Sequence, residues 1–156
     1  MTVDYCRRYI IPAASSLLSP MPSASEILAA IALQESGLTA RQQVNGPARG
    51  LWQFEVAGVA AVLQHRRTGA VIREALTALC YHDDVAESVH QALEHNDILA
   101  ACFARCLLWT SDIPLPGPTE PSLAWTLYVD CWRPGTPRRG TWDADYAAAS
   151  AVMTTI

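Results

Sequence analysis

A run of apolar residues at helical spacing, with a carboxylate on the same face, constrains this chain more than any other feature. Ile31 follows Ile27 by four residues, and Leu38 follows Ile31 by seven. This spacing indicates a helix over about 24–36 with one apolar face. Glu35 lies four residues after Ile31 and three before Leu38, so it falls on that same face. Because burial disfavours a charged carboxylate, we expect desolvation to raise the pKa of Glu35 and to favour its protonated form.

The ends of this helix are also readable. Ser23 with Glu26 three residues later is a capping-box pattern, and Gly37 is a C-terminal stop. Glu35 therefore belongs to the last turn, where the helix dipole disfavours a negative charge. An ordinary helix-terminal carboxylate is the alternative, but the unfavourable position favours a functional role, and a protonated carboxyl suits a general acid.

The length, the composition and the spacing of apolar residues along the rest of the chain predict a mainly α fold in a single domain, residues 1–156. The chain has 156 residues, of which 51% are hydrophobic and 17% charged, which is typical of one compact globular unit. Pro12 is expected to kink or break the first helix, and Asp83 or Asp84 to cap a later one. A small β element, such as a short hairpin, is expected near residues 38–54. The predicted helices are 3–18, 24–36, 55–66, 69–80, 84–94, 97–109, 121–131 and 142–153.

Composition argues against several classes of function. A net charge of −4 and a pI near 5.5 argue against broad nucleic-acid binding. No apolar run approaches the roughly 20 residues that a membrane span needs. Arg7 and Arg8 precede an apolar run that is too short for a signal peptide and is interrupted by Pro12. We therefore expect a protein made in the cytoplasm without a signal peptide.

The cysteines and histidines do not suggest a metal or cofactor site. The five cysteines are an odd count without a Cys-x-x-Cys pair, which is typical of reduced, mostly buried thiols. The four histidines have no serine or cysteine partner at a catalytic spacing, and no zinc set is complete. We expect neither a metal nor a cofactor.

Two short motifs, taken together, resemble a known superfamily. The first is Glu-Ser at a helix end, and the second is Gly-Leu-(bulky)-Gln-(apolar) after a short gap. Here those positions read Glu35-Ser36 and Gly50-Leu51-Trp52-Gln53-Phe54. The stretch 30–54 thus resembles the lysozyme-like superfamily, most closely the soluble-lytic-transglycosylase type and the phage muramidases.

The resemblance implies roles for particular residues. Glu35 would be the catalytic acid/base, Ser36 would lie near it and contact substrate, and Gln53 would line the sugar cleft, where its amide both donates and accepts. Trp52 and Phe54 are expected in the core, with a platform for carbohydrate as the alternative, and Trp52 stands where the family has a small or sulfur-bearing residue.

The family also has a late Ala-Tyr-Asn motif, whose tyrosine sits close to the catalytic glutamate. This sequence lacks that motif, and Tyr128 is the best match, because Trp125, Tyr128 and Trp132 share one helix face. An aromatic core stripe is the alternative, and Trp142 and Tyr146 are weaker candidates. We expect Tyr128 and Gln53 to flank Glu35 across a cleft.

The resemblance implies cleavage of the peptidoglycan β-1,4 bond between N-acetylmuramic acid and N-acetylglucosamine. A hydrolytic muramidase ordinarily uses two carboxylates, whereas a lytic transglycosylase needs one acid/base and forms a 1,6-anhydro product. Glu55, Asp112 and Asp130 are the possible second acids, but Glu35 is the one obvious acid, which favours the transglycosylase. A non-catalytic glycan-binding protein and a helical interaction protein stay as alternatives.

The expected partner is a peptidoglycan glycan strand. Without a signal peptide, the protein would reach the cell wall through a holin-like pore, in a phage virion or as part of a secretion assembly.

Overall fold

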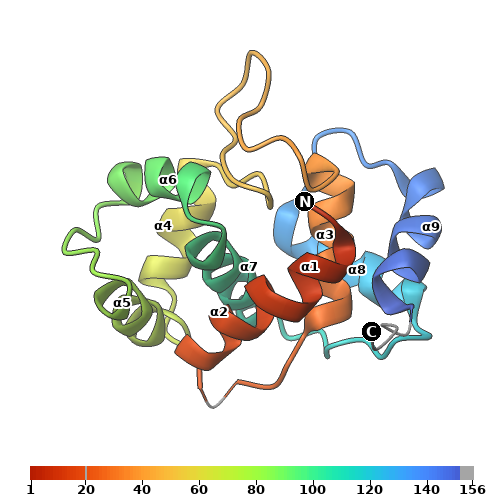
Figure 1. Cartoon of the computed structure of the whole chain (residues 1–156), viewed down its shortest axis with the longest axis horizontal. Helices are drawn as coiled ribbons and strands as arrows, with labels where there is room; N and C mark the ends of the chain where they lie inside the picture. Colours follow the sequence, from red (N-terminus) through yellow and green to blue (C-terminus); the bar gives the residue numbers. More distant parts are fainter. Residues whose placement is uncertain (20, 152–156) are drawn as a thin grey trace.

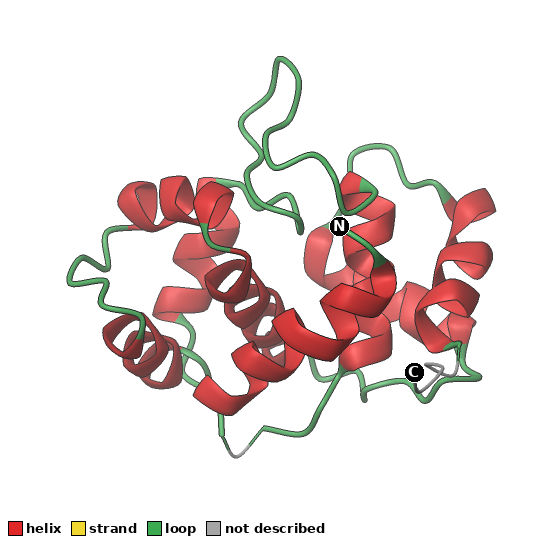
Figure 2. Cartoon of the chain, viewed as in Figure 1, coloured by secondary structure: helices red, strands yellow, loops and turns green. Residues whose placement is uncertain are grey.

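The structure is a computed structural model that describes residues 1–19 and 21–151, and it is mainly helical (Figures 1 and 2). The predicted mainly α fold class is therefore confirmed. The elements are α1 (Val3–Tyr5), the π-helical turn η1 (Cys6–Ile10), α2 (Ile11–Leu17), α3 (Ser25–Ser36), α4 (Val56–Gln64), α5 (Gly69–Ala78), α6 (Ala86–His95), α7 (Asp97–Thr110), α8 (Pro121–Trp132) and α9 (Arg139–Ser150).

The helices form two groups, with α7 and the N-terminal helices between the groups (Figure 1). Figure 1 shows α3, α8 and α9 on one side and α4, α5 and α6 on the other. Helix α7 and the N-terminal helices lie between them, and α7 contacts α2, α4, α5, α6 and α8. Every residue of α7 from Leu99 to Leu108 is buried, as expected for a helix that is apolar almost all round.

Helix α3 carries Glu35 and packs most extensively against α9. It ends as predicted, because Gly37 adopts the left-handed conformation (φ 61°) and its N–H donates to the Leu33 carbonyl. The predicted capping box at its start is wrong. Ser23 pairs with the Ser25 hydroxyl, and the Glu26 carboxylate forms an ion pair with Arg7 at 3.0 Å.

Of the two expected effects of Pro12, a kink or a break in the first helix, the structure excludes the break. The turn before Pro12 widens to π geometry, in which the Ile11 N–H donates to the Cys6 carbonyl. Proline lacks an N–H and crowds the carbonyl of the preceding turn, and a wider turn relieves both problems. Residues 3–17 therefore run on as one helical segment.

Two other predicted helix starts need correction. Helix α6 begins at Ala86 with Val85 as its N-cap, and neither aspartate caps it. Asp83 accepts the Val85 N–H in the preceding turn, and Asp84 pairs with Arg73. Helix α9 begins at Arg139 rather than 142, and the predicted end at 153 lies outside the described residues.

The segment 38–54 contains no strand within the described residues. It forms two isolated antiparallel bridges, Gln42 with Arg49 and Arg49 with Phe54, so the expected β element is reduced to these pairs. Ion pairs of Arg41 with Asp97 (2.6 Å) and of Arg49 with Glu94 (3.1 Å) attach the segment to α7 and α6. The chain therefore returns beside α3 before α4 begins (Figure 1).

Within the described ranges, no helix is both long and apolar enough to cross a membrane. The five cysteines are free, and Cys6, Cys102 and Cys106 are buried. Burial raises the pKa of each of these three thiols to about 12, so they remain protonated and serve as small apolar core side chains.

Candidate functional site

Glu35 is a half-buried carboxyl that a tyrosine holds in place. It lies in the last turn of α3, and the Tyr128 hydroxyl donates a hydrogen bond to its Oε1 at 2.5 Å. Burial raises the pKa of Glu35, while the bond from Tyr128 and the charge of Arg138 act in the opposite direction. The predicted effect of desolvation on this acid is confirmed.

Tyr128 reaches Glu35 from α8 and is itself held rigidly. Its ring is 2% exposed and stacks on Trp142, with centroids 5.1 Å apart and an interplanar angle of 9°. Burial and the bond to Glu35 raise the pKa of Tyr128, so the hydroxyl stays a proton donor. The expected proximity of Tyr128 to Glu35 is confirmed. The Tyr146 hydroxyl instead donates to the Gly117 carbonyl at 2.8 Å.

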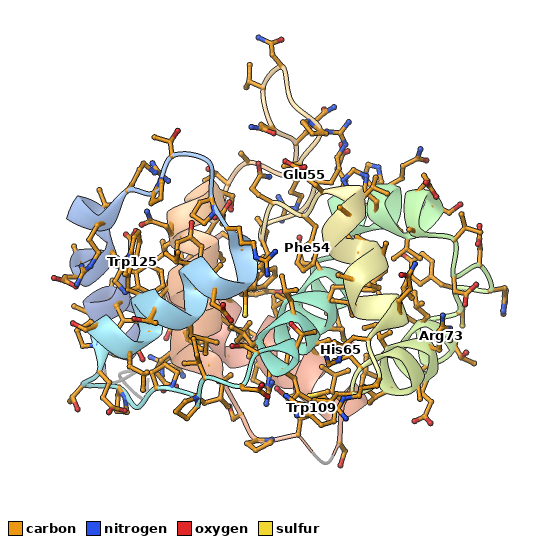
Figure 3. The ribbon with its side chains drawn as sticks, turned by 180° about the vertical axis from the view of Figure 1, so that it is seen from behind. Phe54, Glu55, His65, Arg73, Trp109 and Trp125 are labelled. Atoms are coloured by element: carbon orange, nitrogen blue, oxygen red, sulfur yellow. The ribbon has the colours of Figure 1, made fainter. Side chains whose placement is uncertain are left out.

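A cleft of about 900 Å³ opens beside these two side chains. Figure 3, seen from behind, shows Phe54 and Glu55 between the ribbons of α4 and α8. The lining residues are Gln34, Glu35, Gln43, Ala48, Gln53, Phe54, Glu55, Ala57, Gly58, Ala61, Leu107, Thr110, Ser111, Tyr128, Asp130, Cys131, Trp132, Arg133, Pro134, Gly135, Thr136 and Arg138. A concave site of this size is typical of ligand binding, and many of the side chains that line it are polar or charged.

Gln53 lines the cleft in a tight turn that folds back on Gly50. Its backbone is left-handed (φ 49°), and both its N–H and its side-chain Nε2 donate to the Gly50 carbonyl, at 3.0 and 2.9 Å. Its side-chain oxygen has no hydrogen-bond partner among the described residues. The structure thus brings Glu35, Gln53 and Tyr128 to one cleft, as predicted.

The motif is anchored through Trp52, which is fully buried as expected. Its indole N–H donates to the Leu28 carbonyl at 2.8 Å, and its own carbonyl accepts from the Trp132 indole at 2.9 Å. Trp52 therefore connects α3 to α8. Phe54 is also buried, at 3% exposed, so the core prediction for both residues is confirmed.

Ser36 braces the motif and does not line the cleft. Its single hydroxyl hydrogen is shared between the Leu51 carbonyl at 2.7 Å and the Ala32 carbonyl at 3.0 Å, and its oxygen accepts from the Leu38 N–H at 3.2 Å. These contacts hold the Gly50–Phe54 segment against the end of α3. Substrate contact by Ser36 stays a prediction, and no contact of the structure supports it.

The three candidate second acids differ in whether they line the cleft. Glu55 and Asp130 line the cleft, whereas Asp112 does not and forms an ion pair with Arg67 at 2.6 Å. Asp130 also accepts a hydrogen bond from the Ser111 hydroxyl at 2.6 Å. Two carboxylates besides Glu35 therefore face the space in which a substrate would lie.

Sequence reasoning missed Gln34, Arg133 and Arg138 as cleft residues. Gln34 directly precedes the acid, is 2% exposed, and exchanges hydrogen bonds with Arg138 across the start of α9. The sequence held only a faint signal, a buried-face amide beside Glu35 and an Arg/Pro/Gly loop over 133–140. Neither feature identifies the other as its partner.

Among the described residues, no group of three or more His, Cys, Asp and Glu side chains is placed to hold a metal ion. The cleft brings together the half-buried acid, its tyrosine and the polar groups around them. No protein-family model, no curated protein and no solved structure matches this chain.

Proposed function

We propose that this protein cleaves the β-1,4 bond between N-acetylmuramic acid and N-acetylglucosamine in peptidoglycan, as a lytic transglycosylase with Glu35 as general acid/base. The observation that carries this proposal is the Glu35–Tyr128 pair at the cleft. A carboxyl whose pKa is raised by burial keeps its proton closer to neutral pH, as a general acid must. The Glu-Ser and Gly-Leu-Trp-Gln-Phe motifs add the resemblance to enzymes that cut this bond.

The chemistry needs one acid that works twice. Protonated Glu35 would give its proton to the glycosidic oxygen as the C1–O bond breaks, which leaves an oxocarbenium-like muramyl unit and a Glu35 carboxylate. That carboxylate would then take the proton of the C6 hydroxyl while O6 bonds to C1, which forms the 1,6-anhydro product. Tyr128 would orient the acid through both steps, and Gln53 would bind sugar hydroxyl or acetamido groups.

A hydrolytic muramidase is the second candidate, because Glu55 and Asp130 line the same cleft. In that reaction one of these carboxylates would activate water or attack C1, and the product would carry a reducing end. The acid role of Glu35 is the same in both candidates. The two differ in the group that captures the muramyl unit.

The test is mass spectrometry of muropeptides after digestion of purified peptidoglycan. We expect anhydro-muramyl ends from the wild type, and a fall of about 10²–10⁴-fold for Glu35→Gln, which keeps the shape and removes the proton. Glu74→Gln, at an exposed position of α5 outside the cleft, is the matched control and should act as the wild type does. Reducing ends would favour the muramidase. Near-normal activity of a folded Glu35→Gln protein would exclude both.

A further inference from the structure

We propose that Arg133 and Arg138 form a carboxylate-binding site at the cleft, which recognises an anionic substituent of the glycan strand next to the bond that is cut. This inference rests on the proposed function, because it specifies the substrate of the same site. It adds a binding site for a charged group to a cleft otherwise suited to neutral sugar. Both residues lie outside the motifs on which the enzyme resemblance depends.

The first observation is the charge balance of the arginines. The chain has eleven basic side chains, and the sequence shows that each is an arginine. Within the described residues, Arg133 and Arg138 form no ion pair, although both line a cleft that also holds three carboxyl groups. The remaining two without an ion pair in the described part of the chain, Arg66 and Arg105, lie outside the cleft, and the other seven are paired: Arg7, Arg8, Arg41, Arg49, Arg67, Arg73 and Arg139.

Arg138 is fixed in place by an amide rather than by a counter-ion. One of its guanidinium nitrogens donates to the Gln34 carbonyl, and its own carbonyl accepts from Gln34 Nε2 at 3.0 Å. The Thr141 hydroxyl donates to Gln34 Oε1 at 3.0 Å and so fixes the orientation of that amide. An arginine held through one of its five N–H donors keeps its charge and most of its donors for a ligand.

Arg133 is held in a similar way at the other end of the same loop. It directly follows α8 in a left-handed conformation (φ 48°), which is unfavourable for a residue with a side chain. Its Nε donates to the Asp130 carbonyl at 3.3 Å, a neutral acceptor. Residues 133–138 thus bring two guanidinium groups to one cleft without neutralising either of them.

The position of Arg138 indicates where on the substrate the anion would lie. Arg138 bonds to the carbonyl of Gln34, the residue directly before the acid, and its charge opposes the rise that burial causes in the pKa of both Glu35 and Tyr128. A guanidinium binds a carboxylate through two parallel N–H···O bonds, which fixes both position and orientation. A sugar whose bond lies at Glu35 would therefore carry its carboxylate toward this loop.

On a peptidoglycan strand, this carboxylate has two possible sources. In a strand stripped of peptide it is the lactyl group of the muramyl sugar, and in an intact strand it belongs to the stem peptide. A chitin oligosaccharide has the same β-1,4 backbone with N-acetyl groups but carries neither. These three ligands separate recognition of the charge from recognition of the sugar.

The experiment measures binding by calorimetry in the Glu35→Gln background, so that no ligand is consumed. The ligands are chitin oligosaccharides, peptide-free glycan oligomers and peptide-bearing oligomers. Arg133→Gln, Arg138→Gln and the double variant are compared with Arg66→Gln, an exposed arginine outside the cleft. In the Arg66→Gln control we expect at least one anionic oligomer to bind roughly tenfold or more tightly than chitin, the scale of a charged hydrogen-bonded pair.

The double variant should lose that preference and keep its affinity for chitin. The preference should also weaken with added salt, because exposed charges are screened. The anionic oligomer whose affinity falls identifies the source of the carboxylate. If Arg138→Gln disturbs the contact with Gln34 and the domain unfolds, Arg133→Gln alone still tests the loop, with the thermal melt as the check of folding.

Other outcomes overturn the inference in distinguishable ways. If the wild type cleaves peptidoglycan and the arginine variants keep the preference for anionic strands, only the carboxylate site is wrong. An equal loss of affinity for neutral and anionic ligands gives the arginines a purely structural role and also overturns it. If the control binds no glycan and the wild type releases no muropeptide, this inference and the proposed function fail together.

Discussion

Tyr128 Oη and Glu35 Oε1 lie 2.5 Å apart at the cleft, and the proposed function depends on this contact. The hydrogen bond favours the ionised form of Glu35, and burial favours the neutral form; burial is the larger effect. Tyr128 thereby limits how far the pKa of the acid rises while it fixes the orientation of the carboxyl. The same contact therefore bears on protonation and on geometry.

Replacing Tyr128 by phenylalanine should separate these two effects. Loss of a buried, paired hydroxyl should cost on the order of 1 kcal/mol in the free energy of unfolding, and turnover should fall by more, because the acid is no longer oriented. The pKa of Glu35 should rise further, since the bond that lowers it is gone. The alkaline limb of the activity profile, where the acid loses its proton, should therefore move to higher pH.

Denaturant unfolding and the pH dependence of muropeptide release give the two measurements for Tyr128→Phe. Tyr146→Phe is the matched control, because its hydroxyl bonds to Gly117 and does not line the cleft. It should lose similar stability and keep the wild-type pH profile. An unchanged profile in Tyr128→Phe would remove Tyr128 from the acid's immediate environment in solution.

At the scale of elements, the Gly50–Phe54 segment is held between helices. On one side it bonds to α3 and α8 through Ser36 and Trp52. On the other side the His90 ring nitrogen of α6 donates to the Phe54 carbonyl at 2.8 Å, in a buried contact. Gln53 takes its position in the cleft from these contacts and from its own turn, because the segment contains no helix or strand.

Gly50 lets the Gly50–Phe54 segment approach α6 closely, because it has no side chain. Its backbone is left-handed (φ 76°), and a Cβ there would lie 2.8 Å from the Leu93 carbonyl oxygen of α6. Gly50→Ala should therefore destabilise the domain by about 1–3 kcal/mol, the usual cost of such strain, and should also lower activity. Gly140→Ala, in the first turn of α9, is the control, since a Cβ there meets nothing within 4 Å and alanine loses less backbone freedom on folding than glycine does. Thermal unfolding should move the two variants in opposite directions; two equal shifts would contradict this close approach.

Local sequence patterns predicted most of the helices. The features that they missed depend on contacts between residues far apart in the sequence. The apolar spacing and Gly37 correctly place the end of α3, because both act within one turn. The capping box failed because Glu26 bonds instead to Arg7, 19 positions away in the chain. Gln34 and Arg138 were missed because their contact joins residues 104 positions apart. Glu35 and Tyr128 were found only because the motif supplied a reason to seek a partner.

At the scale of the whole molecule, the position of Glu35 lowers the stability of the folded state when its carboxyl is ionised. Helices α3, α8 and α9 and helices α4, α5 and α6 join through one continuous apolar core, and Glu35 sits where this core meets the cleft. An ionised carboxylate there is poorly solvated, so the folded state takes up its proton more readily than the unfolded chain does. The proposed function and folding therefore make opposite demands on this position.

Glu35→Gln should consequently stabilise the domain at neutral pH. Below the ordinary glutamate pKa of 4.5, the carboxyl is protonated in both the folded and the unfolded states, and it adds no pH-dependent penalty. As pH rises through the raised pKa of the folded state, the wild type loses stability relative to the variant. The difference in stability should then level off at roughly 0.5–2 kcal/mol, the range of single stabilising substitutions.

Denaturant unfolding of both proteins at several values from pH 4 to pH 8 measures this difference, with the exposed Glu74→Gln as the control that should show no such trend. A variant less stable than the wild type at neutral pH, or a difference that does not change with pH, would mean that the buried carboxyl is not destabilised as its surroundings indicate.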